Sequence, residues 1–147
     1  MLEATGTRFL RPLVAVIEAR ALAASGEWER ALGVLRDAQQ HQDATAERWL
    51  ASEVWRTLGD IQRMAPGADS AVAEVAYQHA LEVSRAQGAR TLELRAASSL
   101  ATVWLERGER QRAAALLVQV CQDFPSGVAC ADLVEARRLL ASGLRNP

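Results

Sequence analysis

The sequence predicts an all-α fold, an α-solenoid made of about three helical hairpins and a C-terminal capping helix. Ala, Leu, Arg and Glu, all strong helix formers, dominate the chain. Apolar residues recur at helical spacing, with no alternating run typical of a strand. Matching small side chains return about every forty residues, which predicts that helix pairs repeat. At 147 residues the chain has the length of a single domain, expected over 1–147.

The first hairpin is expected over residues 10–43. Its first helix begins near Pro12, because a residue without an N–H suits the first turn of a helix. Ser25-Gly26 ends that helix. The second helix follows from about Glu27, and its apolar pattern ends near Gln42.

The second hairpin is expected over residues 45–87. Its first helix opens near Trp49 and ends before the loop at 64–69, where Pro66 disfavours helix in the residue before it. Ser70, a favourable N-cap residue, is predicted to begin the next helix.

The third hairpin is expected over residues 89–124, with Gly108 at the corner between its helices. A loop at 124–127 follows. The last amphipathic helix is predicted over 129–142, as a cap on the array.

An internal repeat links the three hairpins. Small residues on the first helices let the second helices approach closely, and small residues on the second helices do the same in return. A leucine or tyrosine four residues further along each second helix fills the space between hairpins. The anchor alanines of the second helices are 42 and 40 residues apart. The small residues of the first helices are Ala19, Gly59 and Ala101, and those of the second helices are Ala31, Ala73 and Ala113. The residues that fill the space between hairpins are Leu35, Tyr77 and Leu117.

The pattern Trp-x-x-Leu-Gly at 55–59, followed by Ala73, Tyr77 and Ala80, resembles the tetratricopeptide repeat (TPR). The usual TPR period is about 34 residues, and HEAT-type repeats, with about 40–47, are the alternative. The resemblance implies a right-handed solenoid in which the first helix of each hairpin lines the concave face.

A longer series of motifs covers most of the chain: 5–12, 47–49, 86–89, 93–97, 99–101, Trp104, Gly108, Phe124, 132–133 and 139–140. In this order the motifs resemble the C-terminal TPR-like region of large bacterial signalling ATPases with adenylate/guanylate cyclase or transcriptional-activator N-terminal domains. The run Gly-Val-Ala-Cys at 127–130 departs from the Gly-Phe-Asp-Thr-like run of that family. The last helix is therefore expected to dock differently.

The TPR register places a polar groove on the concave face, and this groove is the predicted binding site. Arginine forms bidentate contacts with carboxylates, so an acidic peptide, extended or helical, is the expected ligand. The predicted groove residues are Arg20, Glu53, Arg56, Asp60, Arg63, Arg95, Ser98, Ser99 and Thr102.

Catalytic chemistry is not expected. All 17 basic residues are Arg, so the chain has no Lys for a phosphate-binding loop, and none of the quoted motifs is catalytic. The two histidines, His41 and His79, lack metal-site spacing, and Cys121 and Cys130 lack a Cys-x-x-Cys arrangement. We predict no catalytic, metal or cofactor site, and core packing for Trp55 and Trp104.

The predicted function is that of a non-catalytic protein–protein interaction or scaffold module, acting as the sensor or regulatory part of a signalling ATPase or as a stand-alone relative. The alternatives are a helical DNA-binding regulator and an all-α enzyme or small-molecule sensor with a pocket between hairpins. A net charge of −1 argues against nucleic acid. No apolar run approaches a membrane span, so a cytoplasmic location is expected. Uncovered apolar residues near Val14 and Ile17 predict self-association or docking to preceding repeats.

Overall fold

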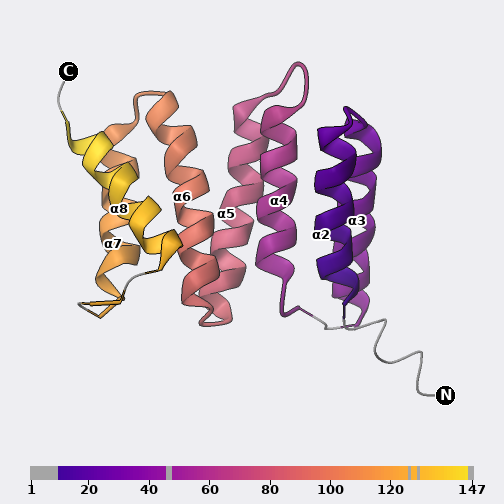
Figure 1. Ribbon diagram of the computed structural model, residues 1–147, viewed down its shortest axis with the longest axis horizontal. Helices are drawn as coiled ribbons and strands as arrows, with labels where there is room; N and C mark the ends of the chain where they lie inside the picture. Colours follow the sequence, from indigo (N-terminus) through magenta and orange to yellow (C-terminus); the bar gives the residue numbers. More distant parts are fainter. Residues whose placement is uncertain (1–9, 46–47, 126, 129, 146–147) are drawn as a thin grey trace.

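The computed structural model describes residues 10–45, 48–125, 127–128 and 130–145 of the chain. Seven helices lie in these ranges: α2 (Arg11–Ala24), α3 (Trp28–Thr45), α4 (Ala51–Met64), α5 (Ser70–Ala86), α6 (Arg90–Glu106), α7 (Arg110–Gln122) and α8 (Ala131–Leu144). The described ranges contain no β-strand, which confirms the predicted all-α class. Figure 1 shows the helices standing side by side in a row, from α2 and α3 at one end to α7 and α8 at the other. Two parts of the quoted motifs, residues 5–9 and Glu47, lie outside the described residues. Ala129, within the 127–130 run, also lies outside them, as does Ser126 just before that run.

Most helix ends lie where the sequence places them. Pro12 occupies the first turn of α2, and Gly26, with φ of 80°, takes the left-handed conformation after its end. The predicted N-cap of α5 is wrong by one residue. Asp69 caps the helix, because its Oδ1 accepts the N–H of Ala71 at 2.8 Å, and Ser70 is the first helical residue.

The helices pack as pairs, α2 with α3, α4 with α5 and α6 with α7. Each first helix also contacts the first helix of the next pair, so that α2 contacts α4 and α4 contacts α6. Within the described residues the second helices α3, α5 and α7 make no such contacts with one another. Neighbouring pairs are also joined through the second helix of one pair and the first helix of the next, α3 with α4 and α5 with α6.

The last helix contacts both α6 and α7, as α6 contacts both α4 and α5. The predicted last helix is present as α8, at the end of the row, in the position that the first helix of a further pair would occupy.

The core forms two clusters that meet at Trp55, a side chain packed against both. The anchor alanines Ala31, Ala73 and Ala113 are fully buried, as the repeat predicts. The closest approach lies at Gly59, where a Cβ would stand 2.6 Å from Cε1 of Tyr77. Glycine is required there because the tyrosine ring occupies the space of a side chain.

Candidate functional site

A groove crosses the first helices α2, α4 and α6 and ends on α8. Its volume is about 460 Å³. The structure brings eight of the nine predicted residues together in its lining: Arg20 from α2; Glu53, Arg56 and Arg63 from α4; and Arg95, Ser98, Ser99 and Thr102 from α6. Asp132, Glu135 and Leu139 of α8 complete it.

The ninth predicted residue, Asp60, does not line the groove. Its Oδ2 accepts a hydrogen bond from Arg56 at 2.8 Å, and its Oδ1 accepts one from the hydroxyl of Tyr77 at the same distance. Asp60 therefore supports the groove from behind.

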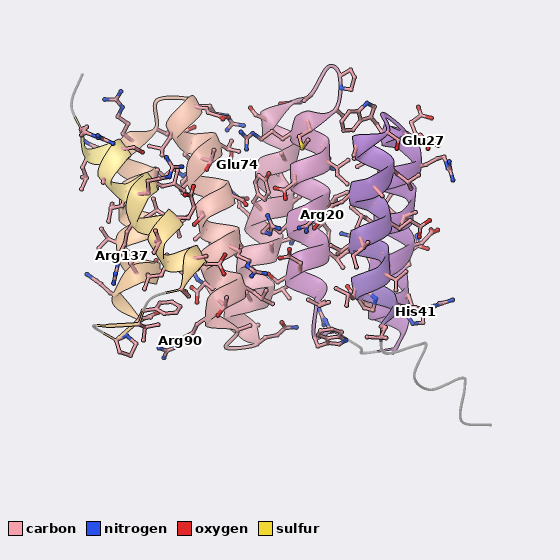
Figure 2. The ribbon with its side chains drawn as sticks, in the orientation of Figure 1. Arg20, Glu27, His41, Glu74, Arg90 and Arg137 are labelled. Atoms are coloured by element: carbon pink, nitrogen blue, oxygen red, sulfur yellow. The ribbon has the colours of Figure 1, made fainter. Side chains whose placement is uncertain are left out.

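Glu53 lies at the centre of a network that joins α2 to α4. Arg56 donates to both of its oxygens, from Nε to Oε2 at 3.0 Å and from Nη2 to Oε1 at 2.7 Å. Arg20 donates to Oε1 at 3.0 Å and contacts the hydroxyl of Thr57 at 3.4 Å. Figure 2 labels Arg20, which reaches from α2 toward α4.

Burial and the neighbouring charges act in opposite directions on the pKa of Glu53. Burial alone would raise the pKa of Glu53, but the hydrogen bond from Arg56 and the charges of Arg56, Arg20 and Arg95 lower it below its ordinary value. Burial also raises the pKa of Tyr77, and the negative charge and hydrogen bond of Asp60 raise it further. Glu53 is thus ionised and Tyr77 neutral at physiological pH.

Two of the four arginines that line the groove, Arg20 and Arg95, are more exposed than the carboxylates that hold them. The side chain of Arg20 is 50% exposed and that of its partner Glu53 is 10% exposed. Arg95 is 43% exposed, and its Nε lies 3.0–3.1 Å from the two carboxylate oxygens of the less exposed Asp132. Arg63 differs, because its partner Glu106 at 2.7 Å is the more exposed of the two.

The three lining residues of α8 were missed by the sequence interpretation. A signal for them exists, because Leu133, Ala136 and Leu139 each follow a buried residue of α6 (Leu94, Ala97 and Leu100) by 39 positions. This offset is close to the 40–42 of the other units. The last helix therefore carries the first-helix pattern.

The hydroxyl groups of the groove have no catalytic partner set. Thr102 donates to the carbonyl oxygen of Ser98 at 2.8 Å. The Ser98 Oγ is buried and has no hydrogen-bond partner among the described residues. Within the same residues no group of three His, Cys, Asp or Glu side chains converges as a metal site.

A second polar cluster surrounds Glu74, which Figure 2 labels on α5. Its Oε1 accepts from Nε1 of Trp104 at 2.9 Å, Arg107 pairs with its Oε2, and the guanidinium of Arg112 lies 4.0 Å from the Trp104 ring centroid. Trp104 is buried, as predicted. Glu74 thus links α5 to Trp104 of α6 through a hydrogen bond and to Arg112 of α7 through an ion pair.

Comparisons with known proteins give no relative for this chain: no family model matches it, and no curated protein or solved structure matches it significantly. None of the helices within the described residues combines the length and apolar character needed to cross a bilayer.

Proposed function

We propose that this chain is a non-catalytic interaction module, a right-handed solenoid of TPR-like hairpins whose groove binds a peptide rich in acidic side chains. The observation that carries the proposal is that Arg20 and Arg95 are more exposed than the carboxylates that hold them, Glu53 and Asp132. Each arginine is held through one nitrogen, Nη2 of Arg20 and Nε of Arg95, and both side chains line the groove. Fixed guanidiniums of this kind favour bidentate contacts with carboxylates.

The arrangement of helices supports the solenoid. First helices that contact each other, beside second helices that do not, favour a row that curves with the first helices on its inner side. The groove lies on that side and draws residues from every first helix. A surface that spans several repeats suits an elongated ligand better than a compact one.

The charge balance of the groove limits the kind of ligand. Four arginines line it beside three carboxylates, so its net charge is small. A weak overall field gives little attraction to a polyanion such as DNA. Selectivity is expected instead from a few carboxylates placed at the spacing of Arg20 and Arg95.

We propose further that the module serves as the sensor or regulatory part of a bacterial signalling ATPase, or is a stand-alone relative of one. The ordered motifs from Ala86 to Leu140 support this placement. Sequencing the gene region would test it. An NTPase encoded in frame upstream is the expected result, and an unrelated upstream gene with an intervening stop codon would leave only the stand-alone form.

The groove itself is tested by selecting displayed peptides on the full chain and measuring their affinity by calorimetry. We expect acidic peptides to be enriched and the variant Arg20→Gln/Arg95→Gln to weaken their binding by about tenfold or more, since each change removes a charge-assisted contact. Arg56 is left intact because it holds Glu53 and Asp60 in the fold.

The matched control is Arg30→Gln/Arg36→Gln, two exposed arginines of α3 that lie outside the groove. This variant has the same net charge as the groove variant. Equal loss of affinity in both would mean that the peptides respond to net charge alone, and the groove would then have no specific role. Preferential binding of duplex DNA over peptides would favour the DNA-binding alternative.

A further inference from the structure

The outward face of α2, at the end of the row away from α8, carries exposed apolar side chains. Val14 and Ile17 are 55% and 60% exposed, and Leu13 beside them is also exposed. Forty residues further along the repeat, Val14 and Ile17 correspond to Val54 and Thr57 of α4, and both of these are buried. Helix α4 contacts α2 and α3. This face of a first helix is therefore a packing face within the row, and no described residue covers it in α2.

Four residues form a stripe along this face of α2. Arg11, Val14, Ala15 and Glu18 are spaced by three, one and three positions, and all four line one hollow between α2 and α3. Such spacing places them on one side of a helix, with about 10.5 Å between the ends of the stripe. The stripe is positive at one end, apolar in the middle and negative at the other end.

The charges of the stripe are poorly satisfied within the chain. Glu18 has no hydrogen bond or ion pair among the described residues, and Arg11 has one long contact, 3.4 Å from its Nη1 to Nδ1 of His41. In contrast, Glu53 is bound by two arginines and Glu74 by Arg107 and Arg112. Arg11 and Glu18, both exposed at the ends of the stripe, thus keep charge available for a partner, while Ala15 between them is largely buried.

We propose that a second copy of the chain covers this face, with the two α2 helices antiparallel about a two-fold axis. Reversing the stripe exchanges its positive and negative ends. Arg11 of each copy then lies opposite Glu18 of the other, and Val14 lies opposite Ala15. Ile17, next to Glu18 and three positions from Val14, borders this contact in each copy.

The charge pattern selects a second copy over an unrelated helix. An isologous interface needs a surface that complements itself after a two-fold rotation, and two-fold dimers are the commonest oligomers. A stripe that reads positive, apolar, apolar, negative meets this requirement in the antiparallel direction alone, because a parallel pairing would set like charges together. The opposite end of the row lacks this pattern, since the exposed Val134 on α8 is followed by Arg137 and Arg138.

Sedimentation equilibrium of the full chain, from low micromolar to several hundred micromolar concentration, tests the proposal. A monomer–dimer equilibrium is expected. Ile17→Glu should raise the dimer dissociation constant on the order of a hundredfold, because each interface would bury two new charges. Val134→Glu, a change at a valine with the same 60% exposure as Ile17, should leave the constant unchanged.

A charge exchange tests the antiparallel register itself. Arg11→Glu and Glu18→Arg, each alone, replace two attractive pairs by two repulsive ones and should weaken the dimer by roughly tenfold. The double variant Arg11→Glu/Glu18→Arg restores opposite charges and should return the constant to within about threefold of the original value. Circular dichroism of each variant checks that the helices remain folded.

A chain that stays monomeric at the highest concentration overturns the proposal, whether another segment of the chain or a different protein covers α2. A dimer that is insensitive to Ile17→Glu also overturns it, since the interface would lie elsewhere. A dimer in which the double variant is as weak as the single variants refutes the antiparallel pairing. Peptide binding at the groove is independent of all these outcomes.

Discussion

Replacing Gly59 by alanine tests the closest helix contact of the row. A Cβ at this position would lie 2.6 Å from Cε1, 2.8 Å from Cδ1 and 3.0 Å from Cζ of Tyr77. The ring cannot turn away easily, because Tyr77 is fully buried and its hydroxyl donates to Asp60. Either the ring or the two helices must therefore move.

The expected loss of stability follows from three effects. Overpacking of a core costs about 1–3 kcal/mol. Loss of the hydrogen bond to the charged Asp60 adds about 1.5–3 kcal/mol if the ring is displaced. The better helix propensity of alanine returns about 1 kcal/mol. We therefore expect Gly59→Ala to lower the free energy of unfolding by about 0–2 kcal/mol if the helices move apart and by about 1.5–5 kcal/mol if the ring is displaced, measured by urea denaturation followed by circular dichroism.

Gly33→Ala is the matched control, since Gly33 also lies within a helix but a Cβ there would meet no atom within 4 Å. It should stabilise the chain by about 0.5–1 kcal/mol. The two other units carry Ala with Leu where this one carries Gly59 with Tyr77. Gly59→Ala should accordingly cost less in a Tyr77→Leu background. A Gly59→Ala variant as stable as Gly33→Ala would refute the close contact and the repeat interpretation that rests on it.

Two further changes probe single interactions. Glu53 has a folded-state pKa below its ordinary value of 4.5, so its contribution to stability is full above pH 4.5 and is lost as the pH falls through the lowered value. Glu53→Gln should therefore reduce stability at neutral pH and flatten the acid side of a plot of unfolding free energy against pH. An unchanged acid slope would contradict this. Asp69→Ala removes the cap of α5 and should lower the free energy of unfolding by about 1 kcal/mol in urea denaturation. Ser70→Gly tests the neighbouring position, which the sequence favoured as the cap. Asp37→Ala, at an exposed carboxylate of α3 with no partner among the described residues, is the control, and a smaller loss for Asp69→Ala than for this control would show that the cap contributes nothing.

The helix pattern and the repeat were predictable because each depends on local spacing. Apolar periodicity identified the helices, and the Trp-x-x-Leu-Gly register of the TPR pattern brought Arg20, Glu53 and Arg95 to one groove. The cap of α5 was less predictable, because Asp69 and Ser70 are both good N-cap residues and the choice depends on the backbone of Asp69.

The pairing of charges within the groove was not predictable from the sequence. Position in the repeat identifies the face on which Asp60 lies but not whether its carboxylate points into the groove or toward Arg56 and Tyr77. The α8 residues were missed because a single terminal helix has no second repeat partner to reveal its register. Their 39-residue offset from α6 is recognisable once α6 and α8 are known to pack together.

Hydrogen exchange of the chain with and without a selected acidic peptide tests the groove most directly. Binding there should slow exchange in residues 51–64 and 90–106, the first helices that carry Glu53, Arg56 and Arg95. Slower exchange confined to α3, α5 and α7 would place the ligand on the second helices and contradict an interaction module that works through its first-helix groove.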